Sequence, residues 1–229
     1  MKHTLKKGYI TSWGDFLMNG EISPTAVMKI FEDLATIHAE QLGFGWEAMK
    51  KRNQVFVLSR QKVIFKKPIN QTGEITGITW PTDANGKRIA ERNYQIQINN
   101  EVSAESISKW CLIDIEKRSI CKIEDITAEK LRADSVEVGE FKRVAFDESF
   151  KKVFTYTVRN SGIDINQHLN NKRFLEIALD AVELRSIKEF EIIFNKECFL
   201  GDEIEVWTNE SEVIGKRKDE VVFSVAFLF

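Results

Sequence analysis

The sequence has 229 residues, of which 43% are hydrophobic and 30% are charged, and its formal net charge is −2. This composition is typical of a folded globular protein and excludes a disordered chain. The near-neutral balance provides no global basic field that would attract nucleic acid or an anionic membrane. No stretch approaches the roughly 18 apolar residues of a membrane-spanning helix. We therefore expect neither nucleic acid nor a membrane as a partner.

The cysteines and the N-terminus bear on the compartment. Cys111, Cys121 and Cys198 lack the paired spacing of a disulfide framework or a zinc site. Free thiols in odd number are typical of a reducing compartment. The basic N-terminal residues are not followed by an apolar segment, so the sequence predicts neither a signal peptide nor a transit peptide. We therefore expect a cytoplasmic protein.

The first half of the chain predicts a strand, a long helix and a run of strands. Residues 4–16 are strand-like, and Ser23 followed by Pro24 marks a helix N-terminus. Apolar residues then recur at helical spacing for about five turns, until Gly43 ends the helix. An antiparallel meander with a hairpin turn at residues 83–86 is expected next, with strands at 54–65, 73–80, 88–98 and 106–115.

The second half repeats this plan after a connecting segment. Residues 116–149 are charged and poorly periodic, and we expect a short helix within them near residues 127–132. A strand at 152–159 and a helix over 171–184 follow. Further strands are expected at 190–194, 203–207 and 221–229.

Short matching segments indicate an internal duplication. Residues 63–68 align with residues 192–197, since each is an apolar strand end followed by polar residues. The repeated order of elements predicts an α+β fold, a tandem double hotdog in which each half is a curved antiparallel sheet wrapped around a central helix. We place the first half at residues 1–125, a charged linker at 126–149 and the second half at 150–229.

A polar motif directly precedes the second helix. Asp164, Asn166 and His168 alternate along the chain, so in an extended backbone their side chains project from one face. The first N–H groups of the following helix are unpaired, and its dipole favours negative charge nearby. Acyl-transfer chemistry such as thioester hydrolysis needs donors of this kind, because they stabilise the oxyanion of the tetrahedral transition state.

The first half does not reproduce this motif. Counting back from the two expected helix starts pairs Leu17 with Asp164 and Glu21 with His168. A lone Asp or Asn before a helix is usually a cap, and a lone histidine is usually structural. The combination occurs in the second half alone, so we place the chemistry there.

Several segments resemble those of acyl-acyl-carrier-protein (acyl-ACP) thioesterases. The motif from Asp164 to Asn171 is similar to theirs, and so is the element Lys196-Glu197-Cys198 that follows about 30 residues after the histidine. In the first half, the Ser-Lys-Trp strand at 106–112 and the helix end at 40–44 also resemble that family. The matching segments follow the family's order over most of the chain.

The resemblance implies a double-hotdog enzyme that hydrolyses fatty acyl-ACP thioesters to free fatty acid and ACP. It implies four catalytic residues: Asp164, Asn166, His168 and Glu197. No cofactor and no metal ion are implied, and the three histidines are too scattered to form a ligand cluster. The absence of a transit peptide makes the chain resemble a bacterial member.

Substrate preference stays open at this stage. Ile177 stands where the family commonly has tryptophan, and Asn195-Lys196 replaces an arginine pair. The family's acyl pocket lies in the first half, which suggests lining residues on the first helix. Candidates are Met28, Phe31 and Leu34, although these also fit an ordinary helix core.

Two mechanisms remain open from the residues. In one, Glu197 or His168 is the general base for a water, Asn166 and helix N–H groups hold the oxyanion, and Asp164 orients the site. In the other, a Cys198 thiolate paired with His168 attacks the thioester. Neighbours on a strand face opposite sides, so Glu197 and Cys198 cannot both enter one site, and we favour Glu197.

The expected partner is an acyl carrier protein that carries the substrate. Carrier proteins are acidic, so the basic residues near the motif are candidates for docking: Lys151, Lys152, Lys172, Arg173 and Lys196. The alternatives are an acyl-CoA thioesterase, a hydratase or dehydratase on the same fold, and a non-catalytic acyl-binding protein. A monomer and a homodimer both fit a duplicated chain.

Overall fold

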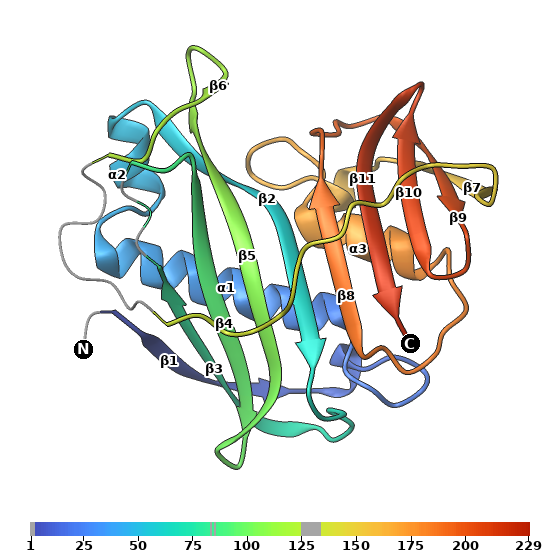
Figure 1. Cartoon of the computed structure of the whole chain (residues 1–229), viewed down its shortest axis with the longest axis horizontal. Coiled ribbons are helices and arrows are strands. Elements are labelled where there is room, and N and C mark those ends of the chain that lie inside the picture. The colour runs from blue at the N-terminus through green and yellow to red at the C-terminus, as the bar shows by residue number, and fades with distance from the viewer. Residues whose placement is uncertain (1–2, 83, 85, 125–133) are drawn as a thin grey trace.

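The computed structural model describes residues 3–82, 84, 86–124 and 134–229. In this part of the chain a single antiparallel sheet of eleven strands runs through the whole molecule (Figure 1). The first-half elements are β1 (Leu5–Thr11), α1 (Pro24–Leu42), α2 (Trp46–Lys51), β2 (Gln54–Phe65), β3 (Gly73–Pro81), β4 (Ile89–Ile98), β5 (Glu101–Asp114) and β6 (Ser119–Ile120). The second-half elements are β7 (Lys151–Thr157), α3 (Asn171–Leu179), β8 (Glu189–Phe194), β9 (Glu203–Thr208), β10 (Glu212–Arg217) and β11 (Glu220–Leu228).

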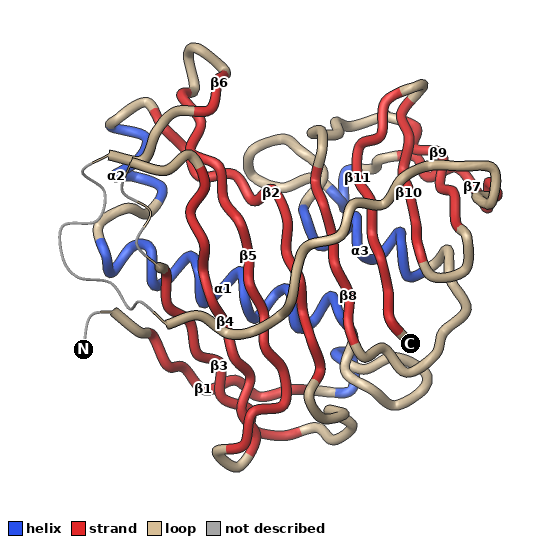
Figure 2. Tube along the Cα trace, in the orientation of Figure 1, coloured by secondary structure: helices blue, strands red, loops and turns tan. Residues whose placement is uncertain are grey.

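The strand order is the same in the two halves. It runs β1-β3-β4-β5-β2 and then β8-β11-β10-β9-β7, so each of these five strands of the first half has a counterpart in the second, while β6 pairs with β5 outside this order. The equivalent strands β2 and β8 pair with each other, from Arg60 opposite Ile193 to Ile64 opposite Glu189, and this pairing joins the halves. Helices α1 and α3 lie on one face of the sheet, each behind the strands of its own half (Figure 2).

The predicted meander of the first half is partly wrong. Strands β3, β4 and β5 pair in succession as expected. Strand β2 pairs with β5 instead of β3, because the connection after β2 carries the chain to the far edge, where β3 pairs with β1. This arrangement leaves β2 as the strand that meets the second half.

Both long helices begin where the sequence predicts. The Ser23 hydroxyl accepts the N–H of Thr25 at 3.2 Å, Pro24 opens α1, and Gly43 closes it with a left-handed φ of 82°. The Asn170 side chain caps α3 by accepting the N–H of Lys172 at 3.0 Å. Helix α3 is five residues shorter than the predicted 171–184, because residues 180–188 turn back to reach β8.

Three elements are absent from the sequence prediction: α2, the two-residue strand β6, and β10. Helix α2 has six residues, too few for an apolar stripe to emerge. Strand β10 contains Gly215, and glycine is a poor strand former. A Cβ at Gly215 would lie 2.0 Å from the Phe223 ring, so this glycine provides the space in which that ring packs.

Residues 134–149, here called the crossing segment, run across the sheet face opposite the helices (Figure 1). Val136 and Val138 are buried there against Trp80 and Ile107. At the junction of the halves, Lys62 donates to the Glu140 carbonyl at 3.0 Å. The predicted linker is therefore a packed part of the fold over these residues. The helix expected near 127–132 and part of the turn at 83–86 lie outside the described residues.

The crossing segment covers a buried carboxylate at the junction. Glu191 is 4% exposed and accepts the N–H of Lys142 at 2.9 Å, while its other carboxyl oxygen has no hydrogen-bond partner. Burial raises the pKa of Glu191 above its ordinary value despite the nearby Lys62 and Arg60. A raised folded-state pKa means that ionised Glu191 destabilises the folded protein, and that this penalty grows as pH rises through that pKa.

We expect Glu191→Gln to raise the melting temperature at pH 8, with a gain that shrinks as pH falls toward 5. For a chain of this size each kcal/mol corresponds to about 2–4 °C. Thermal unfolding at both pH values measures the effect. The contrasting variant is Glu189→Gln, which breaks the 2.9 Å ion pair of the 4%-exposed Lys62 and should lower the melting temperature. Equal shifts in the two variants would contradict this account.

Candidate active site

The motif before α3 forms a closed loop. The Asp164 N–H donates to the His168 carbonyl at 2.9 Å, and the Gln167 N–H donates to the Asp164 carbonyl at 3.0 Å. Gln167 adopts a left-handed φ of 66°. The extended backbone predicted for this segment is therefore wrong, because these internal hydrogen bonds fold it into a turn.

The Asp164 side chain holds this loop together. Its Oδ1 atom accepts the backbone N–H of Asn166 at 2.8 Å and that of His168 at 3.3 Å. Asp164 thus orients the residues that carry the other candidate side chains, which is a positioning role achieved through the backbone.

A backbone hydrogen bond brings His168 and Glu197 together. The Leu169 N–H donates to the Cys198 carbonyl at 2.7 Å, and the two candidate residues directly precede this pair. His168 Nδ1 lies 3.5 Å from Glu197 Oε1, with 31% and 44% of the side chains exposed. The His168 ring also packs edge-on against Phe199 at a centroid distance of 5.1 Å. The structure therefore brings these two predicted site residues into an accessible pair.

Cys198 points into the core, away from this pair, although residues 197 and 198 lie in the loop after β8 and not in the strand that the sequence predicted. It is fully buried, and burial raises the pKa of its thiol to about 12. The nucleophilic and metal-binding form of cysteine is the thiolate, which is not populated at neutral pH with such a pKa. The Cys198 mechanism therefore has no support in the structure.

The donors available for an oxyanion are fewer than expected. The cap occupies the Lys172 N–H, the Arg173 N–H donates to the Asn170 carbonyl, and the Asn170 N–H donates to Gly162. Asn166 is exposed, and its side-chain amide forms no hydrogen bond among the described residues. The Asn166 amide is thus one side-chain donor of the motif that is free to meet a ligand.

The loop before α1 has the same backbone as the motif loop. The Leu17 N–H donates to the Glu21 carbonyl at 2.8 Å, and Gly20 has a left-handed φ of 81° at the position of Gln167. This register is the one predicted by counting back from the helix starts. The side chains differ in what they do: Glu21 accepts a hydrogen bond from Ser186 of the second half at 2.7 Å.

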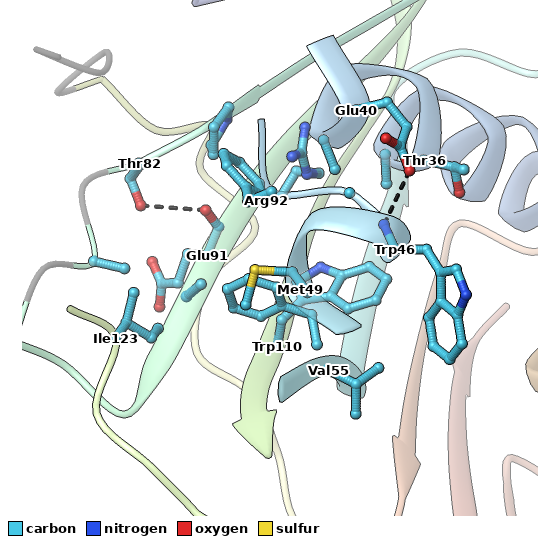
Figure 3. Close-up of a pocket in the computed structure, with 18 residues that line it drawn as sticks. Thr36, Glu40, Trp46, Met49, Val55, Thr82, Glu91, Arg92, Trp110 and Ile123 are labelled. Atoms are coloured by element: carbon cyan, nitrogen blue, oxygen red, sulfur yellow. Dashed lines mark hydrogen bonds between the residues drawn. The ribbon is translucent and has the colours of Figure 1, made fainter. Parts of the chain in front are cut away.

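A cavity of about 200 Å³ lies in the first half, between α1, α2 and strands β2 to β5 (Figure 3). Its walls are mostly apolar, and Met49, Val55, Trp110 and Ile123 contribute to them. The part of α1 that lines it is residues 35–40. Met28, Phe31 and Leu34, the lining residues predicted from the sequence, are buried in the main core instead, because they face the sheet.

One charged side chain stands out among these apolar walls. Arg92 is 5% exposed and donates from Nη1 to His38 Nδ1 at 3.0 Å and to the Thr79 hydroxyl at 3.4 Å. Burial lowers the pKa of Arg92, although a guanidinium remains protonated in proteins. Since the guanidinium can only donate, His38 must be the neutral tautomer with its proton on Nε2.

Two family models match the chain and together cover most of it. The acyl-ACP thioesterase N-terminal domain matches residues 2–131, and the acyl-ACP thioesterase C-terminal domain matches residues 146–225. The chain belongs to the acyl-ACP thioesterase family.

Curated relatives of this acyl-ACP thioesterase family member are plant proteins. An oleoyl-acyl carrier protein thioesterase from Arabidopsis thaliana is 22% identical over 218 residues, which cover 82% of this chain and 59% of that protein. An acyl-[acyl-carrier-protein] hydrolase from Cuphea viscosissima is 24% identical over 194 residues, which cover 75% of this chain and 46% of that protein. The matched part is thus about half of the length of these relatives, and both are described as chloroplastic.

Solved structures confirm the predicted α+β double-hotdog fold. An acyl-ACP thioesterase from Bacteroides thetaiotaomicron superposes with a TM-score of 0.88 at 22% identity, covering 99% of this chain and 97% of that one. A 12:0-ACP thioesterase from Umbellularia californica gives 0.81 at 18% identity, covering 98% and 96%. In the described part of this chain, no helix is both long and apolar enough to cross a membrane.

Most of the basic residues expected to dock a carrier protein form ion pairs within the chain. Three of them form ion pairs: Arg173 with Glu176, Lys152 with Glu205, and Lys196 with Glu220. Lys151 and Lys172 form no ion pair among the described residues. Exposed ion pairs of this kind are weak, so the docking surface stays a prediction for all five side chains.

We expect Asp164→Ala to destabilise the motif loop by about 1–2 kcal/mol, because two backbone donors lose their acceptor. Asp164→Asn keeps an oxygen at the same place and should cost less. Thermal unfolding of the two variants and the wild type measures the difference. If the amide variant were as unstable as the alanine variant, hydrogen bonding by Asp164 would not be what holds the loop.

Proposed function

We propose that this protein hydrolyses fatty acyl-ACP thioesters to free fatty acid and ACP, and so ends fatty acid synthesis. The observation that carries this proposal is the accessible His168–Glu197 pair, which stands beside the loop that carries the Asn166 amide, in a chain that also contains an apolar cavity. Membership of the acyl-ACP thioesterase family supports the same substrate class.

The geometry of the pair favours His168 as the base. Its Nδ1 atom faces the Glu197 carboxylate, which leaves Nε2 to accept a proton from water. Glu197 orients the ring and stabilises the imidazolium that forms. The water oxygen adds to the thioester carbonyl, and the Asn166 amide donates to the oxyanion. Collapse of this intermediate breaks the C–S bond and leaves the fatty acid and a thiol.

The position of Glu197 is itself fixed by neighbouring residues. Arg217 donates to the Glu197 carbonyl at 3.1 Å and also pairs with Asp202. From the first half, Arg118 approaches the Glu197 carboxylate to 3.9 Å at the turn between β5 and β6. The pair therefore stands where the two halves meet, at the same end of the sheet as α2 (Figure 1).

The apolar cavity is the proposed site of the acyl chain. An engineered cavity of about 150 Å³ in another protein holds benzene, so a cavity of about 200 Å³ holds roughly eight carbon-sized atoms. Small residues line it on α1, among them Ala35 and Ala39. Cavity size would then limit the length of the acyl chain that the enzyme accepts.

The first test is thiol release from C8 to C18 acyl-ACP by wild type, His168→Ala, Glu197→Ala and Cys198→Ala. We expect losses of about 10²-fold or more in kcat for the first two variants, because each removes part of the base. Cys198→Ala should retain turnover, since its buried thiol faces the core. Loss of activity in a folded Cys198→Ala protein would favour the thiolate mechanism.

The same assay separates the rival functions. An acyl-CoA thioesterase would hydrolyse acyl-CoA at least as well as acyl-ACP with the same chain. Release of no thiol from either, together with addition or removal of water on an acyl chain, would identify a hydratase or dehydratase. Bound fatty acid without any turnover would identify an acyl-binding protein.

We expect Ala39→Leu to shift the preferred chain by about two to four carbons toward shorter acyl groups. The added side chain fills part of the cavity, and packed walls do not expand to compensate. The chain-length profile of kcat/KM measures the shift. The matched control is Ala145→Leu at an exposed position of the crossing segment, which should leave the profile unchanged. An unchanged profile in both variants would place the acyl chain elsewhere.

A further inference from the structure

Glu32 lies on α1 one helical turn before the residues that line the cavity. Residues at positions i, i+4 and i+8 of a helix share one face, which aligns Glu32 with Thr36 and Glu40. Thr36 and Glu40 both line the cavity (Figure 3). Glu32 therefore continues this lining stripe by one turn toward the start of α1.

In the other direction Glu32 faces the motif of the second half. Helix α1 packs against α3, whose first turn carries Lys172 and which follows directly after the motif loop. Asp164 and Lys172 are close enough to act electrostatically on the Glu32 carboxyl. Glu32 thus lies between the motif loop and the cavity, where a thioester would stand if its acyl chain occupied the cavity.

The surroundings of Glu32 suit proton donation. Glu32 is exposed to solvent, and desolvation by the protein around its carboxyl raises its pKa. The charged groups that act on it are Lys172, Asp164 and Asp33. Asp33 is already engaged by Lys7 and Tyr9 of β1.

We propose that Glu32, contributed by the first half, is a further catalytic residue that protonates the sulfur as the thiol leaves. This inference rests on the proposed thioester hydrolysis. As the C–S bond breaks, its electron pair passes to sulfur, and the Glu32 carboxyl supplies the proton that makes the thiol. Solvent then returns to Glu32 the proton that His168 took from the attacking water. One water is consumed for each acid and thiol formed.

A proton donor matters here because of the leaving group. An alkyl thiol has a pKa near 8.5, so an alkyl thiolate is a basic leaving group in a partly desolvated site. An aryl thiolate delocalises its charge and needs little help. The contribution of Glu32 should therefore depend on which thiol leaves, whereas a purely structural contribution would not.

The experiment compares the wild-type protein with Glu32→Gln on thioesters of one acyl chain. The leaving groups are ACP, N-acetylcysteamine and thiophenol. We expect the variant to lose about 10²-fold in kcat with the first two, which are alkyl thiols, and less than about threefold with thiophenol. The matched control is Glu210→Gln, an exposed carboxylate in the turn between β9 and β10, which should behave as wild type. Thermal unfolding checks that each variant is folded.

Each outcome bears on a separate claim. Equal losses with alkyl and aryl thiols, or no loss with either, would overturn the role of Glu32 while leaving hydrolysis in place. A wild-type protein that releases no thiol from any of the three substrates would instead contradict the proposed function. A selective loss with alkyl thiols alone supports Glu32 as the acid.

Discussion

The antiparallel pairing of β2 with β8 is the interaction on which the rest of the structure depends. It turns two curved sheets into one and sets α1 beside α3, so that a helix of the first half can face a loop of the second. The buried ion pair of Lys62 and the crossing segment reinforce the same junction. Without this pairing, Arg118 and Glu32 would have no relation to the motif loop, and each half would hold only part of the site.

Backbone hydrogen bonds, more than side-chain contacts, fix the geometry of the candidate site. One bond between Leu169 and Cys198 aligns two segments that lie about 30 residues apart in the chain. In the loop after β8, Glu197 then faces outward to His168, and Cys198 faces inward to the core. Of these two adjacent candidate residues, Glu197 is thus accessible, while Cys198 is buried and unreactive.

Local signals in the sequence predict the parts of the fold that local chemistry determines. The capping of α1 by Ser23 and Gly43 is of this kind, and so is the register that pairs the two pre-helix loops. Features that depend on distant contacts could not be predicted from the sequence. They are the place of β2 in the sheet, the residues that line the cavity in place of Met28 and Phe31, and the proximity of Glu32 to Asp164 and Lys172. The turn at Asp164 could not be predicted because the Asp164 side chain accepts hydrogen bonds from backbone N–H groups, which every residue except proline has.

The two loops that precede α1 and α3 have the same backbone conformation, but their side chains have different roles. In the first half, Glu21 fastens the loop to Ser186 across the junction, while the same position in the second half carries His168. In a symmetric dimer of identical chains every substitution appears in both subunits. The loop could therefore not take a structural role in one subunit and keep candidate catalytic side chains in the other. Covalent linkage of the halves removes that restriction. In the single chain, one copy of the structural unit can therefore hold the halves together while the other carries the candidate catalytic residues.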